Sequence, residues 1–149
     1  MATRSKRDLL SPVRAIRPQT INQATSPEYL VSSGVDLRGF DSAMVVVEFG
    51  DIDEMGTSPV GTAKIDVKLE HSDDNSDWSS VSSNDVDNGD VTVTGGVVAT
   101  TQTDVSLLKV GYIGSKRYIR VTLSPLGLTN GGPVTALVVK GHAHLTPVA

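Results

Sequence analysis

Two histidines separated by a single residue, His142 and His144, are the clearest candidates for chemistry in this sequence. In an extended segment, residues two apart point to the same face, so both imidazoles could bind one metal ion. No residue close by in the sequence offers a clear third ligand. We therefore expect a surface or interface pair, and a metal site is the alternative. The third histidine, His71, lies far from both along the chain.

Three short acidic segments could bind Ca²⁺, which prefers clustered carboxylate and carbonyl oxygens. The nearest approach to a calcium loop is residues 85–90, DVDNGD, which lacks the EF-hand spacing and its closing Glu. We expect all three segments to be solvated turns. A carboxylate pair for glycoside hydrolysis stays open, because a sequence does not give the separation of two carboxyl groups. The carboxylates are Asp51, Asp53 and Glu54; Asp73, Asp74 and Asp77; and Asp85, Asp87 and Asp90.

Signals for other chemistry are weak. No nucleophile-elbow pattern surrounds a serine, and no glycine-rich loop follows a strand and opens a helix. The chain has no cysteine, which excludes disulfides and thiolate metal sites and fits a reducing cytoplasm. We expect the only tryptophan, Trp78, to pack in the core or on a hairpin; a sugar-stacking platform is the functional alternative. These features predict a non-enzymatic structural or binding module that needs no cofactor.

The first 17 residues carry five basic residues and one acid, Asp8, a charge of +4, so the rest of the chain carries −8 of the total of −4. Pro12 and Pro18 disfavour a helix and favour an extended course. We predict that residues 1–20 leave the folded domain as an arm that orders on an acidic partner; a solvated tail is the alternative. Nucleic acid is disfavoured by the acidic body and by the lack of interleaved aromatics. The basic residues are Arg4, Lys6, Arg7, Arg14 and Arg17.

The elements that must position these residues read as β-strands. Residues 63–70 alternate strictly between apolar and charged side chains, and residues 116–123 do so in part, as strands with one buried face do. Residues 43–49, AMVVVEF, form a continuous apolar run and predict a central strand buried on both faces. Residues 134–141 predict a last central strand. We expect Ile65, Val67, Leu69, Ile119, Val121 and Leu123 inside, and Lys64, Asp66, Lys68, Arg120 and Thr122 outside.

Turn signals separate these strands from several shorter ones. Gly95 and Gly96 predict a two-residue hairpin turn, and residues 71–77 predict a turn before a returning strand. The spacing predicts an all-β protein, a single β-sandwich of jelly-roll type with about eight or nine strands over residues 21–149. No apolar run is long enough to cross a membrane, and the N-terminus lacks the apolar segment of a secretory signal.

Two segments resemble the discoidin-like jelly rolls. Residues 69–78, LEHSDDNSDW, are similar to a turn of that family, and residues 117–121, RYIRV, are similar to one of its strands. Asn75 replaces the glycine of the family turn, and no cysteine pair closes the ends. The resemblance implies a jelly-roll topology, in a family whose members bind sugars or lipids through their loops.

A broader resemblance covers about half of the chain. Residues 35–43, the 69–78 hairpin, residues 110–121 and residues 140–142 occur in the order seen in small virion proteins of tailed bacteriophages, which are encoded beside the major capsid protein. The resemblance implies a capsid decoration, or cement, protein that stabilises the outer surface of the icosahedral head across capsomer seams.

This reading makes the major capsid protein the partner and the five basic residues of the arm its contacts. It places the chain on the virion surface after assembly in the host cytoplasm, with no membrane and no direct nucleic-acid partner. We also expect self-association, as a trimer. A tail or head–tail component and a carbohydrate-binding module displayed on the virion remain the alternatives.

Overall fold

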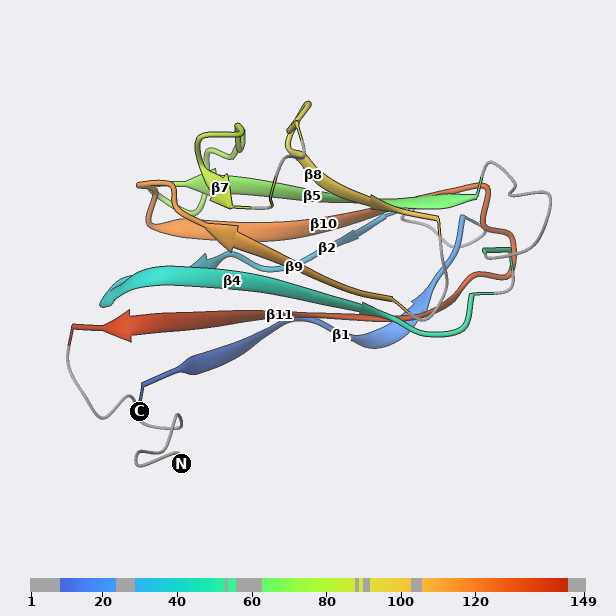
Figure 1. Ribbon diagram of the computed structural model, residues 1–149, viewed down its shortest axis with the longest axis horizontal. Helices are drawn as coiled ribbons and strands as arrows, with labels where there is room; N and C mark the ends of the chain where they lie inside the picture. The colour runs from blue at the N-terminus through green and yellow to red at the C-terminus, as the bar shows by residue number, and fades with distance from the viewer. Residues whose placement is uncertain are drawn as a thin grey trace.

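The computed structural model describes residues 9–23, 29–52, 54–55, 63–87, 89, 92–102 and 106–144. This part of the chain is all β, as the sequence predicts, and contains no helix that could span a membrane. Its strands form two antiparallel sheets that lie one over the other in a sandwich-like arrangement (Figure 1).

Five strands make the first sheet, which we call sheet A. Its order is β1 (Ser11–Ile21), β11 (Gly132–Ala143), β4 (Phe40–Phe49), β9 (Ser106–Tyr112) and β7 (Val86–Asp87). The second sheet, sheet B, is built around β10 (Tyr118–Leu126) and β5 (Lys64–Ser72). β2 (Leu30–Val31) and β3 (Val35–Asp36) pair with β10, and β6 (Ser79–Ser80) and β8 (Val97–Thr101) pair with β5.

The strands pair in a nested order along the chain. β1 pairs with β11, β2 and β3 pair with β10, β4 pairs with β9, and β5 pairs with β8. The first strand therefore lies beside the last, and each later pair lies inside the one before it. The β4–β11 and β5–β10 ladders join these pairs into the two sheets.

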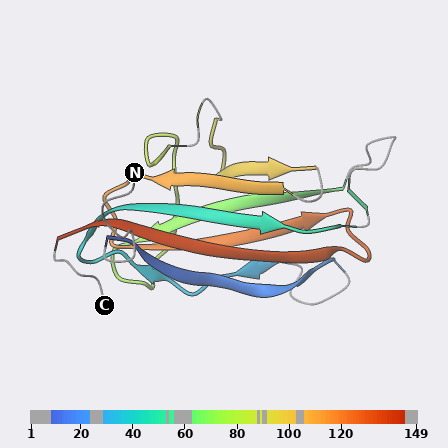
Figure 2. The same cartoon turned by 60° about the horizontal axis from the view of Figure 1, so that its bottom comes forward.

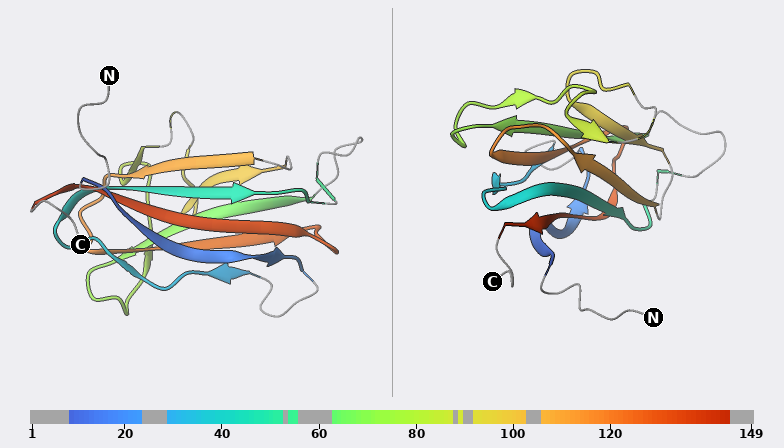
Figure 3. Two further views of the ribbon diagram at one scale, coloured as in Figure 1. Left: turned by 90° about the horizontal axis from the view of Figure 1, so that it is seen from below. Right: turned by 60° about the vertical axis from the view of Figure 1, so that its left-hand side comes forward.

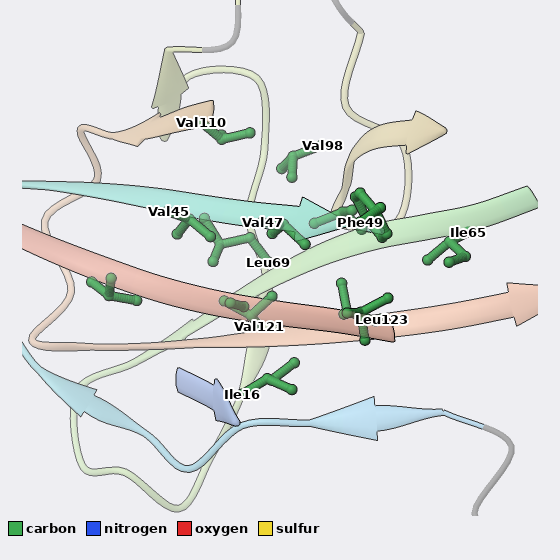
Figure 4. Close-up of a cluster of buried hydrophobic side chains, with 14 of the residues drawn as sticks. Ile16, Val45, Val47, Phe49, Ile65, Leu69, Val98, Val110, Val121 and Leu123 are labelled. Carbon is green, nitrogen blue, oxygen red and sulfur yellow. The ribbon is translucent and has the colours of Figure 1, made fainter. Parts of the chain in front are cut away.

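The core lies between the sheets, where apolar side chains from both layers meet (Figure 4). The predicted inward face is confirmed, because six residues on β5 and β10 are at most 1% exposed. The predicted outward side is confirmed except at Thr122, which is only 9% exposed although it pairs with Lys68 on the outer side of sheet B. The six inward residues are Ile65, Val67, Leu69, Ile119, Val121 and Leu123.

Strand β4 corrects the prediction that residues 43–49 are buried on both faces. The strand is central in sheet A, but only Val45, Val47 and the other residues of one side are buried. Met44 and Glu48, on the opposite side, are exposed, and Val46 is half-buried. The apolar run has an apolar outer side that the described chain does not cover.

The N-terminal segment corrects the prediction of an arm over residues 1–20. Residues 1–8 lie outside the described residues, but Ser11–Ile21 forms β1 and pairs with β11. The segment is extended, as its prolines require, but Ile16 and Ile21 are buried in the core, so it belongs to the domain. Register shifts between Arg14 and Ile16 and between Ile16 and Gln19 interrupt the ladder. Bulges and prolines are typical of edge strands.

The turns follow their residue types. Gly95 and Gly96 have φ of 57° and 80°, as the predicted two-residue turn requires, and Thr94 bridges to Val97 across them. Asn75 has a φ of 63°, which asparagine tolerates better than most residues, so it can stand where the discoidin-like turn has glycine. The described residues form eleven strands rather than eight or nine, because four have only two residues and leave no periodic signal.

Candidate functional site

The five basic residues assigned to partner binding divide into two groups. Arg4, Lys6 and Arg7 lie outside the described residues. Arg14 and Arg17 lie on β1, at the edge of sheet A, and both are exposed. Arg14 pairs with Leu137 of β11, whereas Arg17 falls within the second register shift. Their role in binding stays a prediction.

The outer side of sheet A is a partly apolar surface that the sequence did not predict. Figure 2 and the left view of Figure 3 show β9, β4, β11 and β1 side by side on this side of the molecule. Residues directly opposite each other in paired strands share a face, so the register identifies its members. We call them the open face: Pro12, Arg14, Met44, Val46, Glu48, Leu107, Lys109, Thr135, Leu137 and Val139.

Cross-strand rows give the open face its pattern. The middle row runs Arg14, Leu137, Val46, Lys109, so a cation stands at each end of an apolar pair. The row beside it runs Pro12, Val139, Met44, and ends at Gly111. The row on the other side holds Thr135, Glu48 and Leu107.

The centre of the open face is apolar and accessible. Leu107 is 57% exposed, and Met44 and Leu137 are each 37% exposed. Three rows about 7 Å apart over four strands about 4.8 Å apart cover roughly 400 Å² for the whole face. Six of its ten residues are apolar, and the other four are charged or polar. Exposed apolar side chains that gather on one face mark interaction sites more often than those scattered singly. The open face is therefore a candidate interaction surface.

The outer side of sheet B has a different chemistry, because most of its charges are paired within the chain. Lys64 Nζ lies 3.0 Å from the Asp66 carboxylate, and Arg120 Nε lies 2.7 Å from Glu70 Oε2. Asp66 also accepts a hydrogen bond of 2.7 Å from the Thr100 hydroxyl. The two faces of the sandwich thus differ. On the outer side of sheet B, Lys64 and Arg120 are neutralised by residues that the structure describes and Lys68 is not, whereas the open face has an apolar centre with cations at its border.

Trp78 does not stand free as a sugar platform. The Arg120 guanidinium lies over its ring, 4.5 Å from the centroid, while the same guanidinium bonds Glu70. The ring also packs close to Gly34, where an added Cβ would lie 3.0 Å from the Trp78 Cη2 atom. The tryptophan is half-buried against these neighbours, which agrees with its interpretation as a hairpin-packing residue.

The two C-terminal histidines do not form the pair that an extended segment would give. His142 has a φ of 53°, in the left-handed region, so the alternation of side chains is broken there. His142 Nδ1 lies 2.7 Å from the Ser42 hydroxyl, and His144 Nε2 lies 2.6 Å from Asp41 Oδ1. Ser42 and Asp41 thus contact different histidines, so neither histidine bridges the serine hydroxyl and the carboxylate. No group of three metal-ligating side chains occurs in the described part of the chain.

Carboxylates of the acidic segments hold turns together rather than gather at one point. Glu54 accepts hydrogen bonds from the backbone N–H groups of Thr129, Asn130 and Gly131, which lowers its pKa. Asp74 accepts from the N–H groups of Ser76 and Asp77, and these bonds lower the pKa of Asp74.

Asp85, in the third acidic segment, accepts hydrogen bonds from the Ser82 hydroxyl and backbone N–H, and its pKa is lowered for that reason. Asp53 and Asp90 lie outside the described residues. Asp74 and Asp85 thus act within their own loops, Glu54 clamps the β10–β11 loop, and Asp73 pairs with Lys116.

The one buried histidine, His71, has a local partner. Its Nδ1 atom lies 3.1 Å from the Tyr112 hydroxyl, which also accepts a hydrogen bond of 3.1 Å from the Lys116 backbone N–H. A shallow depression lies beside this group, at the end of the sandwich, and is lined in part by Arg117 and Lys116. Both cations are already paired, with Asp36 and Asp73 respectively. Arg38, which also lines the depression, is exposed and forms no ion pair with a described residue.

No family model, no curated protein and no solved structure matches this chain. Sequence reasoning missed the open face, although its signal was present in the apolar run of residues 43–49. We interpreted that run as burial on both faces, but the residues that the structure describes form two sheets and no helix that could cover the outer side of sheet A.

Proposed function

We propose that this chain is a capsid decoration protein of a tailed bacteriophage, with a jelly-roll fold, and that it binds the outer surface of the icosahedral head through the open face of sheet A. The open face is the observation that carries the binding role. The ordered set of sequence segments described above supports the virion setting.

The strand pairing supports the jelly-roll assignment. A jelly roll of eight strands folds as nested pairs, first with last and second with second-last, divided over two sheets. With β2 and β3 taken as one interrupted strand, this chain has the pairs β1–β11, β2/β3–β10, β4–β9 and β5–β8 in that order. Viral capsid proteins and lectins both use this architecture, so the fold is compatible with a virion protein without requiring one.

Docking through the open face would bury the outward-facing apolar side chains of β4 and β11, which the described residues leave uncovered. Met44, Val46, Leu137 and Val139 would move from water to a protein interface, and apolar burial contributes about 25 cal/mol per Å². The roughly 400 Å² of the face is about half of the ~800 Å² that each partner buries in a standard interface. A single copy would thus bind modestly, and the stability of the head would come from many copies placed across its capsomer seams.

Heads assembled without this chain, from the phage that encodes it, provide the test. Purified protein is mixed with the heads, and binding is measured by co-sedimentation and located by cryo-electron microscopy. Leu137→Asp places a carboxylate in the middle of the open face. The control is Val31→Asp, which changes an apolar residue of comparable exposure, 43% against 37%, on the other sheet.

We expect wild-type protein and Val31→Asp to bind the heads to saturation, and Leu137→Asp to bind at least about tenfold more weakly. Decorated heads should also release their DNA at a higher temperature than bare heads. If wild-type protein is found only on the tail or at the head–tail junction of complete particles, the decoration role is wrong and the alternative structural role replaces it. If it binds glycans in an array but not heads, the module is a carbohydrate-binding one.

A further inference from the structure

We infer that the surface recognised by the open face is a protein surface with an apolar centre and acidic groups on two opposite flanks. The inference rests on the proposed function, and it adds the chemistry of the partner: on the head, this surface would belong to the major capsid protein. It follows from how the cations of sheet A are placed.

The middle row of the open face holds the two cations on which the inference depends. Arg14 and Lys109 stand at its two ends, with Leu137 and Val46 between them. Strands in a sheet lie about 4.8 Å apart, so the Cα atoms at the two ends of the row are about 14 Å apart. A partner that covers the apolar pair must therefore also meet both cations.

Neither cation of the middle row is neutralised by a residue that the structure describes. Arg14 and Lys109 form no ion pair or side-chain hydrogen bond with those residues. On the outer side of sheet B, Lys64 and Arg120 are both paired, and Lys68 is the cation without an ion pair in the described part of the chain. Charges on the border of an interface mainly set the association rate and the choice of partner.

A second copy of this chain fits the open face poorly. In a symmetric dimer the same patch meets itself, so packing the apolar centres together would bring the cations of one copy near those of the other. Glu48 is the one carboxylate among the residues of the face. Like charges in contact disfavour such an arrangement, and an acidic partner removes the conflict.

Nucleic acid is also negative, but it fits the centre of the face poorly. Phosphates are bound by clusters of Lys and Arg that track a backbone, and no aromatic side chain for base stacking occurs on the open face. Covering Leu137 and Val46 with phosphates would leave the apolar pair without an apolar partner.

The test measures binding to heads assembled without the chain, at about 50 mM and about 500 mM salt. Arg14→Glu and Lys109→Glu reverse one flank each. Lys68→Glu is the matched control, because it makes the same charge change on the outer side of sheet B, where Lys68 pairs with Thr122. Leu137→Asp reports on the apolar centre. Sedimentation of free wild-type protein and binding to a random-sequence DNA duplex complete the set.

We expect each flank reversal to weaken binding at 50 mM salt by at least about tenfold, and Lys68→Glu to stay within about twofold of wild type. Wild-type binding should weaken as salt rises, because border charges are screened, and the flank variants should lose part of that salt dependence. Free protein should not associate through the open face, and the DNA duplex should not compete with heads.

Three results would overturn the inference. If flank reversals bind like wild type while Leu137→Asp does not bind, the partner lacks acidic flanks, although the decoration role stands. If free wild-type protein self-associates and Leu137→Asp abolishes this, the occupant is a second copy. If the DNA duplex competes with heads for the face, the occupant is nucleic acid. Failure of wild-type protein to bind heads at either salt concentration rejects the proposed function itself, and the inference with it.

Discussion

Arg14 and Lys109 lie at opposite ends of one cross-strand row, and Leu137 and Val46 separate them. The two cations come from the first and the ninth strand of the chain, so only the pairing of β1, β11, β4 and β9 brings them onto one face. Their placement turns an apolar sheet surface into one with a defined electrostatic preference.

Two adjacent valines of β4 test which face of sheet A is open. Val47 is 1% exposed, so Val47→Asp would bury an unpaired carboxylate and should prevent folding at neutral pH. Val46→Asp makes the same change one residue earlier, on the open face, and should unfold with a stability within about 1 kcal/mol of wild type. Circular dichroism and urea denaturation of both variants provide the measurement. Two variants of equal stability would contradict the assigned faces.

Two N-terminal truncations test whether β1 belongs to the domain. Deleting residues 2–17 removes most of β1, including Ile16, which is 3% exposed. Since burial of a large aliphatic side chain contributes about 1.5–3 kcal/mol, and the core beneath β1 also becomes exposed, stability should fall by about 3 kcal/mol or more. Deleting residues 2–8 leaves β1 intact and is the matched control. Equal melting temperatures for the two truncated proteins would restore the picture of an arm that leaves the domain.

The ion pair between Asp36 and Arg117 predicts an unusual titration. Arg117 donates hydrogen bonds of 3.1 and 2.7 Å to the two carboxylate oxygens, and this interaction is the main reason that the pKa of Asp36 falls to about 2 from 3.8. A lowered folded-state pKa means that the contribution to stability is complete above about pH 4 and is lost as pH falls through about 2. Both side chains are over 40% exposed, so the contribution to stability is small.

Carbon-13 NMR of the Asp36 carboxyl group measures this titration directly. In Arg117→Gln the pKa should rise toward 3.8, although the backbone N–H of Arg38 still donates to Asp36 and should keep part of the shift. A wild-type Asp36 that titrates near its ordinary value would show that the ion pair is not formed in solution.

Two glycines separate backbone strain from crowding. Gly131 and Gly95 both have positive φ, 68° and 57°, so alanine is strained at either position. At Gly95 an added Cβ meets nothing within 4 Å, and Gly95→Ala should cost about 1 kcal/mol. At Gly131 the Cβ would lie 1.8 Å from the Ile21 carbonyl oxygen, so Gly131→Ala must displace β1 and should cost clearly more. Thermal denaturation of both variants decides the comparison, and equal costs would mean that the loop yields freely.

The sequence by itself determined the β class, the inward side of β5 and β10, and the turn at Gly95 and Gly96. These features depend on neighbours in the chain. A period of two places Ile65, Val67 and Leu69 on one side whatever the partner strand is, and two adjacent glycines accept positive φ in any fold. The phage resemblance likewise came from the sequence, and no comparison with known proteins adds to it.

Only the tertiary structure decided the fate of residues whose partners are distant. Extended backbone at residues 11–20 suits an arm and an edge strand equally, and the choice depends on β11, the last strand of the chain. The apolar run of β4 indicates that both sides of the strand are apolar. It does not indicate whether one side or both sides are covered by the rest of the protein. Here the chain supplies two sheets, one side of β4 faces the other sheet, and Met44 and Val46 are left on the outside. Local periodicity is set by backbone geometry, whereas the open face is set by a cross-strand register that only long-range pairing defines.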